Sequence, residues 1–119
     1  NMEDSQAAMR DGSIFEYCKL HDVVIQAWSV LQFGYFKGNF VGNEKFQALN
    51  QVLDRLAIKY GVTSSTIAIS WILRYPAKMQ AVVGTTNPKH LREVSQVGNF
   101  SLTRKEWYEI YLAAGNNLP

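Results

Sequence analysis

The sequence has little cysteine, little net charge and no long apolar run. Its one cysteine, Cys18, excludes an internal disulfide and contributes no cysteine cluster to a metal site. No apolar run reaches the roughly 20 residues of a membrane-spanning helix, and no basic start with an apolar stretch marks a signal peptide. The basic residues are scattered and the net charge is only +2, which argues against nucleic acid as a partner. These absences favour a cytoplasmic protein that binds neither nucleic acid nor a membrane.

The side chains that could carry chemistry are few and lack partners. His21 and His90 have no Asp, Glu, Cys or His at a convincing ligand spacing, so no metal site is predicted. Cys18 has no activating neighbour and is expected to be a small packing residue. Glu106 and Glu109 are one helical turn apart, but a solvated helix face is favoured over an acid–base pair. No catalytic residue is therefore predicted within this sequence.

What the sequence does have is a regular alternation of helical and strand patterns. Residues 44–60 carry apolar side chains every three or four positions, and Gly61 follows where a helix-ending glycine belongs. A second helix is predicted over residues 64–73, with Thr63 as its N-cap. Gly12 is expected to weaken or break an N-terminal helix. The remaining helices are predicted over residues 4–20, 88–97 and 104–114.

Two short apolar segments are predicted as strands of a parallel sheet. Residues 23–28 and 80–83 are nearly continuous in apolar side chains, as in strands buried on both faces. Residues 32–42 between them are predicted to be a long aromatic and glycine-rich loop. Two strands alone make a poor sheet, because each leaves an apolar edge unpaired. The pattern therefore predicts an α/β fold that is part of a larger parallel sheet.

Two segments at the strand ends are candidate ligand sites. Residues 84–87 follow the second strand and open a helix, where free amides and the helix dipole favour phosphate. Trp28 ends the first strand; its indole could stack on a flat ring, while Gly34 and Gly38 would let backbone approach a diphosphate. The residues alone favour simpler interpretations, a tight turn with an N-cap by about two to one and a core tryptophan.

Three segments, in the same order, resemble the aldo-keto reductases, particularly their bacterial oxidoreductase branch. Residues 25–31 resemble the family's seventh barrel strand, residues 60–73 the connection that follows, and residues 83–93 the signature after the eighth strand. The resemblance implies the C-terminal portion of a (β/α)8 TIM barrel, about two β/α units with flanking helices. A complete barrel takes about 250 residues, so residues 1–119 would form one fragment of a single barrel domain.

In the whole enzyme that the resemblance implies, a nicotinamide cofactor reduces the carbonyl of an aldehyde or ketone. Trp28 corresponds to the aromatic residue that stacks on the nicotinamide. Ser29, Leu31 and Gly34 would lie along the diphosphate. Val30 departs from the proline that usually follows the serine. The resemblance thus assigns the segment after the first strand to the nicotinamide half of the cofactor.

The adenosine end of the cofactor would be bound after the second strand. Thr85 and Thr86 would face the 2′-phosphate of NADP, and Glu93 matches a glutamate that often contacts adenine. His90 stands where many members have an arginine, for which histidine is a weaker and titratable substitute. Gly84 stands where many members place a lysine. NADP is therefore the expected cofactor, with NAD as the alternative.

The family's catalytic aspartate, tyrosine, lysine and histidine come from earlier strands, and no residue here matches them by motif. The leading interpretation is an NAD(P)H-dependent oxidoreductase whose cofactor is held partly by this chain. Its partners would be a small carbonyl compound and the missing N-terminal part of the barrel. The alternative is a non-enzymatic interaction module that pairs through exposed sheet edges. An upstream segment with a tyrosine–lysine pair would favour the enzyme.

The 119-residue chain alone is expected to have no carbonyl reductase activity. General acid catalysis requires a group positioned beside the substrate oxygen, and the matching tyrosine is absent. An assay with NADPH and a broad panel of aldehydes checks this expectation. Robust turnover that disappears when a residue within the chain is substituted would contradict it.

Overall fold

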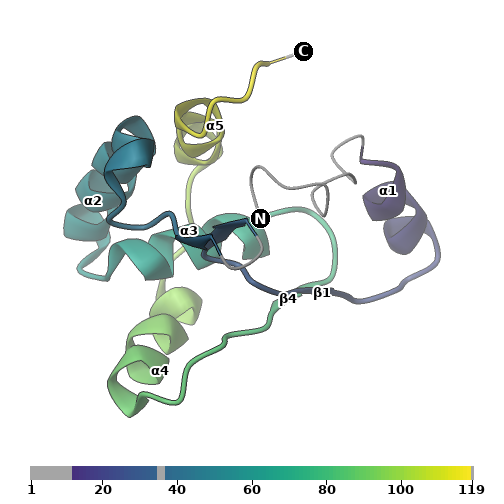
Figure 1. Ribbon diagram of the computed structural model, residues 1–119. Coiled ribbons are helices and arrows are strands. Elements are labelled where there is room, and N and C mark those ends of the chain that lie inside the picture. Colours follow the sequence, from purple (N-terminus) through teal and green to yellow (C-terminus); the bar gives the residue numbers. More distant parts are fainter. Residues whose placement is uncertain (1–11, 35–36, 119) are drawn as a thin grey trace.

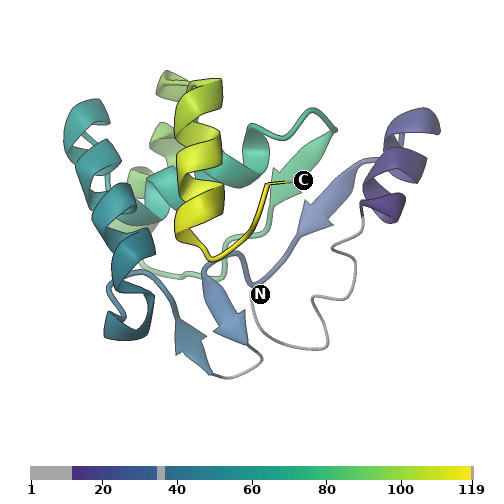
Figure 2. The same cartoon turned by 90° about the horizontal axis from the view of Figure 1, so that it is seen from above.

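Helices gather on one side of a short parallel sheet, and a β-hairpin lies beyond one end of that sheet (Figures 1 and 2). The computed structural model describes residues 12–34 and 37–118. The helices are α1 (Ser13–Leu20), α2 (Gln47–Tyr60), α3 (Ser64–Leu73), α4 (Pro88–Ser95) and α5 (Arg104–Ala113), with 3₁₀ turns η3 (Glu44–Phe46) and η4 (Gln96–Asn99). The strands are β1 (Ile25–Ala27), β2 (Gln32–Gly34), β3 (Gly38–Asn39) and β4 (Met79–Ala81). Among the helices α3 is central, because it contacts α2, α4 and β4.

The predicted helices are present in the described residues, with two differences: residues 44–46 form the 3₁₀ turn η3 instead of the start of α2, and α4 ends at Ser95, before the 3₁₀ turn η4. Gly61 ends α2 with a φ of 66°, a left-handed conformation that residues with a Cβ rarely adopt. The Thr63 hydroxyl accepts from the Thr66 amide at the start of α3. Gly12, with a φ of 80°, directly precedes α1, which confirms it as the weak point of the N-terminal helix. Residues 4–11 of that predicted helix lie outside the described residues.

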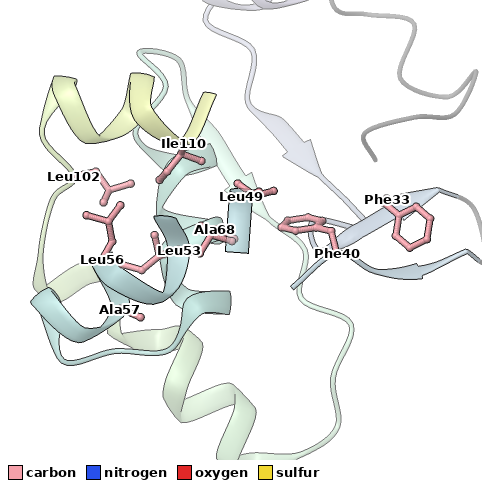
Figure 3. Packing of buried hydrophobic residues seen from close by; sticks show 10 residues of the cluster. Phe33, Phe40, Leu49, Leu53, Leu56, Ala57, Ala68, Leu102 and Ile110 are labelled. Carbon is pink, nitrogen blue, oxygen red and sulfur yellow. The ribbon is translucent and has the colours of Figure 1, made fainter. Parts of the chain in front are cut away.

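The core lies between α2, α3 and α5 (Figure 3). Leu53 and Leu56 of α2 and Ile67 of α3 are completely shielded from solvent. Their burial follows from the three- and four-residue spacing that predicted one apolar face. Truncating such a side chain to alanine typically costs about 2–5 kcal/mol. The other buried members of the cluster are Phe33, Phe40, Leu49, Ala57, Ala68, Leu102 and Ile110.

A tryptophan pair joins α3 to α5. The Trp71 and Trp107 rings stack with their centroids 4.8 Å apart and 10° between their planes. Each indole Nε1 donates to the other residue's backbone carbonyl, over 2.9 Å from Trp71 and 3.0 Å from Trp107. Because Trp71 lies in the last turn of α3, the bond from Trp107 satisfies a carbonyl near the helix end. The reciprocal link joins residues 36 positions apart, so local spacing in the sequence does not indicate it.

β1 and β4 pair in parallel, as the sequence predicted. Both are shorter than the predicted segments 23–28 and 80–83, and β4 begins one residue earlier than expected. Each strand has a single partner in the described sheet, and Val24 and Val82, two positions from the exposed Gln26 and Gln80, are 47% exposed on the uncovered face. Such exposed apolar side chains are typical of a sheet that needs further strands. The register pairs are Ile25–Met79, Gln26–Gln80 and Ala27–Ala81.

The prediction of an irregular loop over residues 32–42 is wrong in part. β2 and β3 pair antiparallel, and the hairpin continues where the Phe40 amide donates to the carbonyl of Leu31 over 3.0 Å. Aromatic packing explains the difference: the Phe33 and Phe40 rings lie 5.1 Å and 6.4 Å from the Phe46 ring. These contacts attach the hairpin to the core cluster, of which Phe33 and Phe40 are members. Residues 35–36 lie outside the described residues.

The 119-residue chain alone is expected to self-associate, because Val24 and Val82 leave apolar surface beside unpaired strand edges. Sedimentation velocity over a range of concentrations should show species larger than a monomer. The double variant Val24→Lys/Val82→Lys should shift the distribution toward the monomer, since charge on a strand edge opposes pairing.

Ile58→Lys is the matched control for self-association, because Ile58 is 84% exposed on α2 rather than on the sheet. This variant should leave the distribution unchanged. The prediction fails if the wild-type chain is a monomer throughout and has slowly exchanging amides in both β1 and β4.

Candidate cofactor-binding site

The two parallel strands end at the same edge of the sheet. The Val82 amide donates to the carbonyl of Ala27 over 2.8 Å, so the chain leaves β1 and β4 side by side. Trp28 and Ser29 directly follow β1, and Gly84 follows β4 after Val82 and one further residue. Figure 2 shows the hairpin beyond this edge and α1 at the opposite one. The fold thus brings two candidate segments that are far apart in the sequence to one place.

Side chains of this sheet alternate between two faces. Ala27 and Met79 line a cavity together with residues of α3 and α5, so they face the helices. Gln26 and Gln80 lie on the opposite, exposed face, where Gln26 Nε2 donates to Gln80 Oε1 over 3.0 Å. Trp28 comes two positions after Gln26 and is 55% exposed, as the alternation predicts for this open face. The indole is therefore accessible to a ligand.

The segment after Trp28 turns sharply into the hairpin. Ser29 has a φ of 53°, which is uncommon for a residue with a side chain. Its carbonyl accepts from the Gln32 amide over 3.0 Å and closes the turn. The Leu31 side chain packs against the core cluster, so this residue offers its backbone rather than its side chain to a ligand.

Gly34 is buried at the end of β2, under the side chain of Lys37. A Cβ at position 34 would lie 2.5 Å from Lys37 Cδ, so only glycine lets this lysine lie so close. The Lys37 amide also donates to the Gly34 carbonyl over 3.1 Å. Sequence reasoning missed Lys37, because among scattered basic residues its position three residues after Gly34 is a weak signal. The structure places the aliphatic part of this side chain against the backbone of Gly34.

The second candidate segment runs from the end of β4 to the start of α4. Thr85 Oγ1 accepts from the Asn87 amide over 3.1 Å, and Asn87 Oδ1 accepts from the Lys89 amide over 2.9 Å. Asn87 therefore caps α4, as the sequence predicted. Gly84 and Thr86 are exposed. The tight turn does not conflict with a phosphate site, since a hydroxyl that accepts from an amide can still donate.

His90 and Glu93 lie on α4, which Figure 1 shows apart from the two strands. His90 is exposed, and Glu93 is half-buried with its carboxylate 3.9 Å from Lys89 Nζ. The buried Thr66 hydroxyl of α3 donates to the Glu93 carbonyl over 2.9 Å and fixes α4 against α3. The nine residues predicted to bind the cofactor therefore lie in the segment after β1 and in the segment from β4 to α4, and they do not surround a single pocket.

Glu106 is not on a solvated helix face, contrary to expectation. It is 6% exposed, and its carboxylate accepts from Lys59 Nζ over 2.5 Å and from the Tyr60 hydroxyl and Thr103 amide, each over 2.8 Å. Burial alone would raise the pKa of this carboxyl, but hydrogen bonds from these donors lower it from 4.5 to about 2. The capping-box spacing of Thr103 and Glu106 was the signal for this inward position. Glu109 is on the surface, as predicted for both.

A tyrosine, a lysine and a carboxylate therefore meet, but they form a helix cap. Burial, followed by the hydrogen bond to Glu106, raises the pKa of the Tyr60 phenol and makes it a weaker acid. The Tyr60 ring also stacks on Phe100 with 4.6 Å between centroids. The cluster joins the end of α2 to the first turn of α5, so its role is to hold these two helices together.

A cavity of about 520 Å³ lies between the helix-facing side of the sheet and helices α3 and α5. None of the nine candidate residues lines it, so it belongs to the helix layer.

Within residues 12–34 and 37–118, no group of three or more His, Cys, Asp or Glu could hold a metal ion. In the same part of the chain no single helix is long and apolar enough to cross a membrane. Residues Glu44–Tyr60 and Ser64–Leu73 reach that length and composition only when taken together, and they are bent by 94° at the break between them.

The sequence matches the aldo/keto reductase family over residues 8–113. It is 34% identical over 89 residues to a 6-dehydroglucose reductase of Agrobacterium fabrum, covering 74% of this chain and 28% of that protein. It is 26% identical over 110 residues to a 9,11-endoperoxide prostaglandin H2 reductase of Trypanosoma cruzi, covering 92% of this chain and 35% of that protein. The crystal structure of a thermostable aldo-keto reductase with the inhibitor epalrestat superposes with a TM-score of 0.69 at 25% identity, over 93% of this chain and 36% of its own.

These matches define the chain as part of a β/α barrel, which confirms the predicted fold class. The chain belongs to the aldo/keto reductase family. It spans about a third of the length of the relatives that it matches.

Glu106→Gln is expected to lower the free energy of unfolding at pH 7 by roughly 2–3 kcal/mol, because a buried carboxylate that accepts from four donor groups is replaced by a neutral amide. The native pKa of Glu106 lies below its ordinary value of 4.5, at about 2. Its contribution is therefore fully present above pH 4.5 and is lost as the pH falls toward 2. Urea unfolding at pH 7, 5 and 3 should show the wild-type and variant stabilities converge at the acid end.

Glu109→Gln is the control for this prediction, since Glu109 forms a surface ion pair with Arg55. Surface pairs contribute about 0–1 kcal/mol, so this variant should stay close to wild type at every pH. A pH-independent difference between Glu106→Gln and wild type would rule out the carboxylate charge as the cause.

Proposed function

We propose that the complete protein is an NAD(P)H-dependent oxidoreductase that reduces the carbonyl of an aldehyde or ketone, and that this chain supplies much of its cofactor-binding surface. The observation that carries the proposal is the shared position of Trp28 and Gly84. Both follow the carboxyl ends of adjacent parallel strands, at one edge of the sheet. That edge is where β/α barrels bind their ligands.

Trp28 is proposed to hold the nicotinamide ring. Its indole is 55% exposed on the open face of the sheet, which would become the barrel interior once further strands close it. When bound, the cofactor supplies the hydride, and Trp28 would fix the plane of the ring. The catalytic acid would come from the rest of the barrel, because the Tyr60 phenol donates its hydrogen bond to Glu106 and has a raised pKa.

The turn and hairpin after Trp28 are proposed to follow the diphosphate. Ser29 would contribute its hydroxyl and backbone, Leu31 would contribute its backbone, and Gly34 would allow Lys37 to pack closely in the same segment. Lys37 lies over Gly34 and would neutralise part of the diphosphate charge. This basic residue supports the proposal from the structure, independently of the family resemblance.

The segment from Gly84 to Glu93 is proposed to bind the adenosine end. The amides at the start of α4 and the hydroxyls of Thr85 and Thr86 would face the 2′-phosphate of NADP. Exposed His90 would add a positive charge when protonated. Because Gly84 provides no charge of its own, NADP preference would depend on these neutral and titratable groups, and NAD remains the second cofactor.

The names of the relatives indicate the first substrates to assay. Proteins named 6-dehydroglucose reductase occur in Agrobacterium fabrum and in Novosphingobium aromaticivorans, the latter 29% identical over 94 residues. We therefore propose an oxidised sugar such as 6-dehydroglucose as the first carbonyl substrate to test. A second candidate function, a module that pairs through sheet edges, is supported by the exposure of Val24 and Val82. The intact mass of the natural protein separates the two.

The double variant Thr85→Val/Thr86→Val of the full-length enzyme is expected to weaken NADPH binding at least about 100-fold, since each hydrogen bond to a charged phosphate contributes about 1.5–3 kcal/mol. NADH lacks the 2′-phosphate, so its dissociation constant should change little. Thr85→Ser/Thr86→Ser retains both hydroxyls and should bind NADPH like wild type. Equal losses for NADPH and NADH would place the adenosine end elsewhere.

His90→Ala tests the side chain at the same end of the cofactor. The imidazole N–H can donate to the 2′-phosphate, so the variant should bind NADPH more weakly than wild type, whereas its affinity for NADH should change little. His21→Ala is the matched control, because His21 is exposed at the end of α1. Fluorescence titrations at pH 7 measure both dissociation constants. Equal affinities of wild type and His90→Ala for NADPH would remove His90 from the site.

A further inference from the structure

Asn50, in the first turn of α2, is a buried polar residue whose side chain has four hydrogen-bond partners. It is only 9% exposed, and its Nδ2 donates to the carbonyls of Phe40 over 2.9 Å, Asn43 over 3.1 Å and Phe46 over 3.1 Å. Its Oδ1 accepts from the amide of Gly42 over 2.8 Å. An amide has two donor hydrogens and one carbonyl, so both ends of this side chain are fully engaged.

Three of these four partners lie in residues 40–43, the segment that leaves the hairpin and returns to α2. This segment lies outside regular strands and helices, and within it the amides of Asn43 and Phe46 donate to the carbonyls of Phe40 and Asn43 over 3.2 Å and 3.0 Å. Asn50 adds side-chain hydrogen bonds to the same two carbonyls and to the Gly42 amide, and it does so from a rigid helix. The fourth partner, Phe46, is one turn earlier along the chain at the entrance to α2.

The anchoring continues through the backbone to the proposed diphosphate segment. Phe40 gives its carbonyl to Asn50, and its amide donates to the carbonyl of Leu31 over 3.0 Å. Leu31 lies between Ser29 and Gly34, the other two residues assigned to the diphosphate. A chain of two hydrogen bonds therefore connects the Asn50 side chain to the centre of that segment.

We propose that Asn50 is a positioning residue that holds the hairpin and its diphosphate-contacting residues in the geometry that binds the cofactor. This inference rests on the proposed function. Asn50 itself does not touch the cofactor; it acts through Phe40 and Leu31. Leu49, Leu53 and Leu56 of α2 pack in the core cluster without using the Asn50 side chain. Loss of the Asn50 side chain should therefore free the hairpin more than it disturbs the helices.

The test compares binding of NADPH with binding of 2′,5′-ADP, which carries the adenosine end without the nicotinamide half. In the full-length enzyme, Asn50→Ala should weaken NADPH at least about tenfold, because the hairpin must be ordered at the expense of binding. The same variant should bind 2′,5′-ADP within about twofold of wild type. Asn50→Asp keeps the acceptor for Gly42 but turns a carboxylate toward three carbonyl oxygens, so it should bind NADPH no better than Asn50→Ala.

Leu56→Ala is the control for general destabilisation, since Leu56 is completely buried in the same helix and its side chain forms no hydrogen bonds. It should lower the thermal midpoint yet leave the ratio of the two affinities unchanged. Hydrogen exchange of the wild-type enzyme supplies a readout that requires no variant. NADPH should slow exchange at Phe40 and Gly42, whereas 2′,5′-ADP should not.

The outcomes separate this inference from the function on which it rests. A wild-type enzyme that binds neither NADPH nor NADH overturns the proposed function. Wild-type binding with an unchanged NADPH affinity in Asn50→Ala or Asn50→Asp overturns the role of Asn50 alone. Equal losses for NADPH and 2′,5′-ADP, or equal protection of Phe40 and Gly42 by both ligands, would also overturn it, because the effect would then not be confined to the hairpin.

Discussion

The parallel pairing of β1 with β4 is the constraint on which the rest of the structure depends. Parallel neighbours cannot be joined by a tight turn, so the chain must leave β1, cross through α2 and α3, and return. The return places both strand ends at one edge, and it leaves one face of the sheet covered by helices and the other open. The open face carries Trp28, and the common edge carries the start of the segment that leads to α4. The candidate site follows from strand direction as much as from residue type.

Features set by local spacing could be predicted from the sequence. The apolar repeat of α2, the caps at Thr63 and Asn87 and the ending glycine at position 61 each depend on residues within one or two helical turns. The parallel strands could be predicted because a short, continuous run of apolar side chains is typical of a strand that is buried on both faces, as in a parallel sheet. Trp28, Gly34 and residues 84–87 could be predicted as candidates from their positions at and after the strand ends, whereas their roles toward the cofactor, and the choice of His90 and Glu93, depended on the family resemblance across three segments.

Features set by distant contacts could not be predicted from spacing. The hairpin forms because Phe33 and Phe40 meet Phe46, and its glycine-rich sequence alone is typical of a loop. Glu106 is buried because Lys59 and Tyr60, at the far end of another helix, provide donors for its carboxylate. Asn50 is an ordinary polar position on a helical wheel until the backbone of residues 40–43 lies across it. In each case the deciding partner comes from a different element.

α5 is attached through its first two turns, where Glu106, Trp107 and Glu109 bond to α2 or α3. All of these partners precede α5 by a long stretch of chain, and Ile110 completes the core that Leu53 and Leu56 begin. During synthesis on the ribosome, α2 and α3 therefore emerge with their apolar faces uncovered. They stay so until residues 104–113 have left the exit tunnel, at a rate of about 5–20 residues per second. For that interval the nascent chain exposes the part of α2 and α3 that α5 later covers, so this core is completed only when residues 104–113 are available.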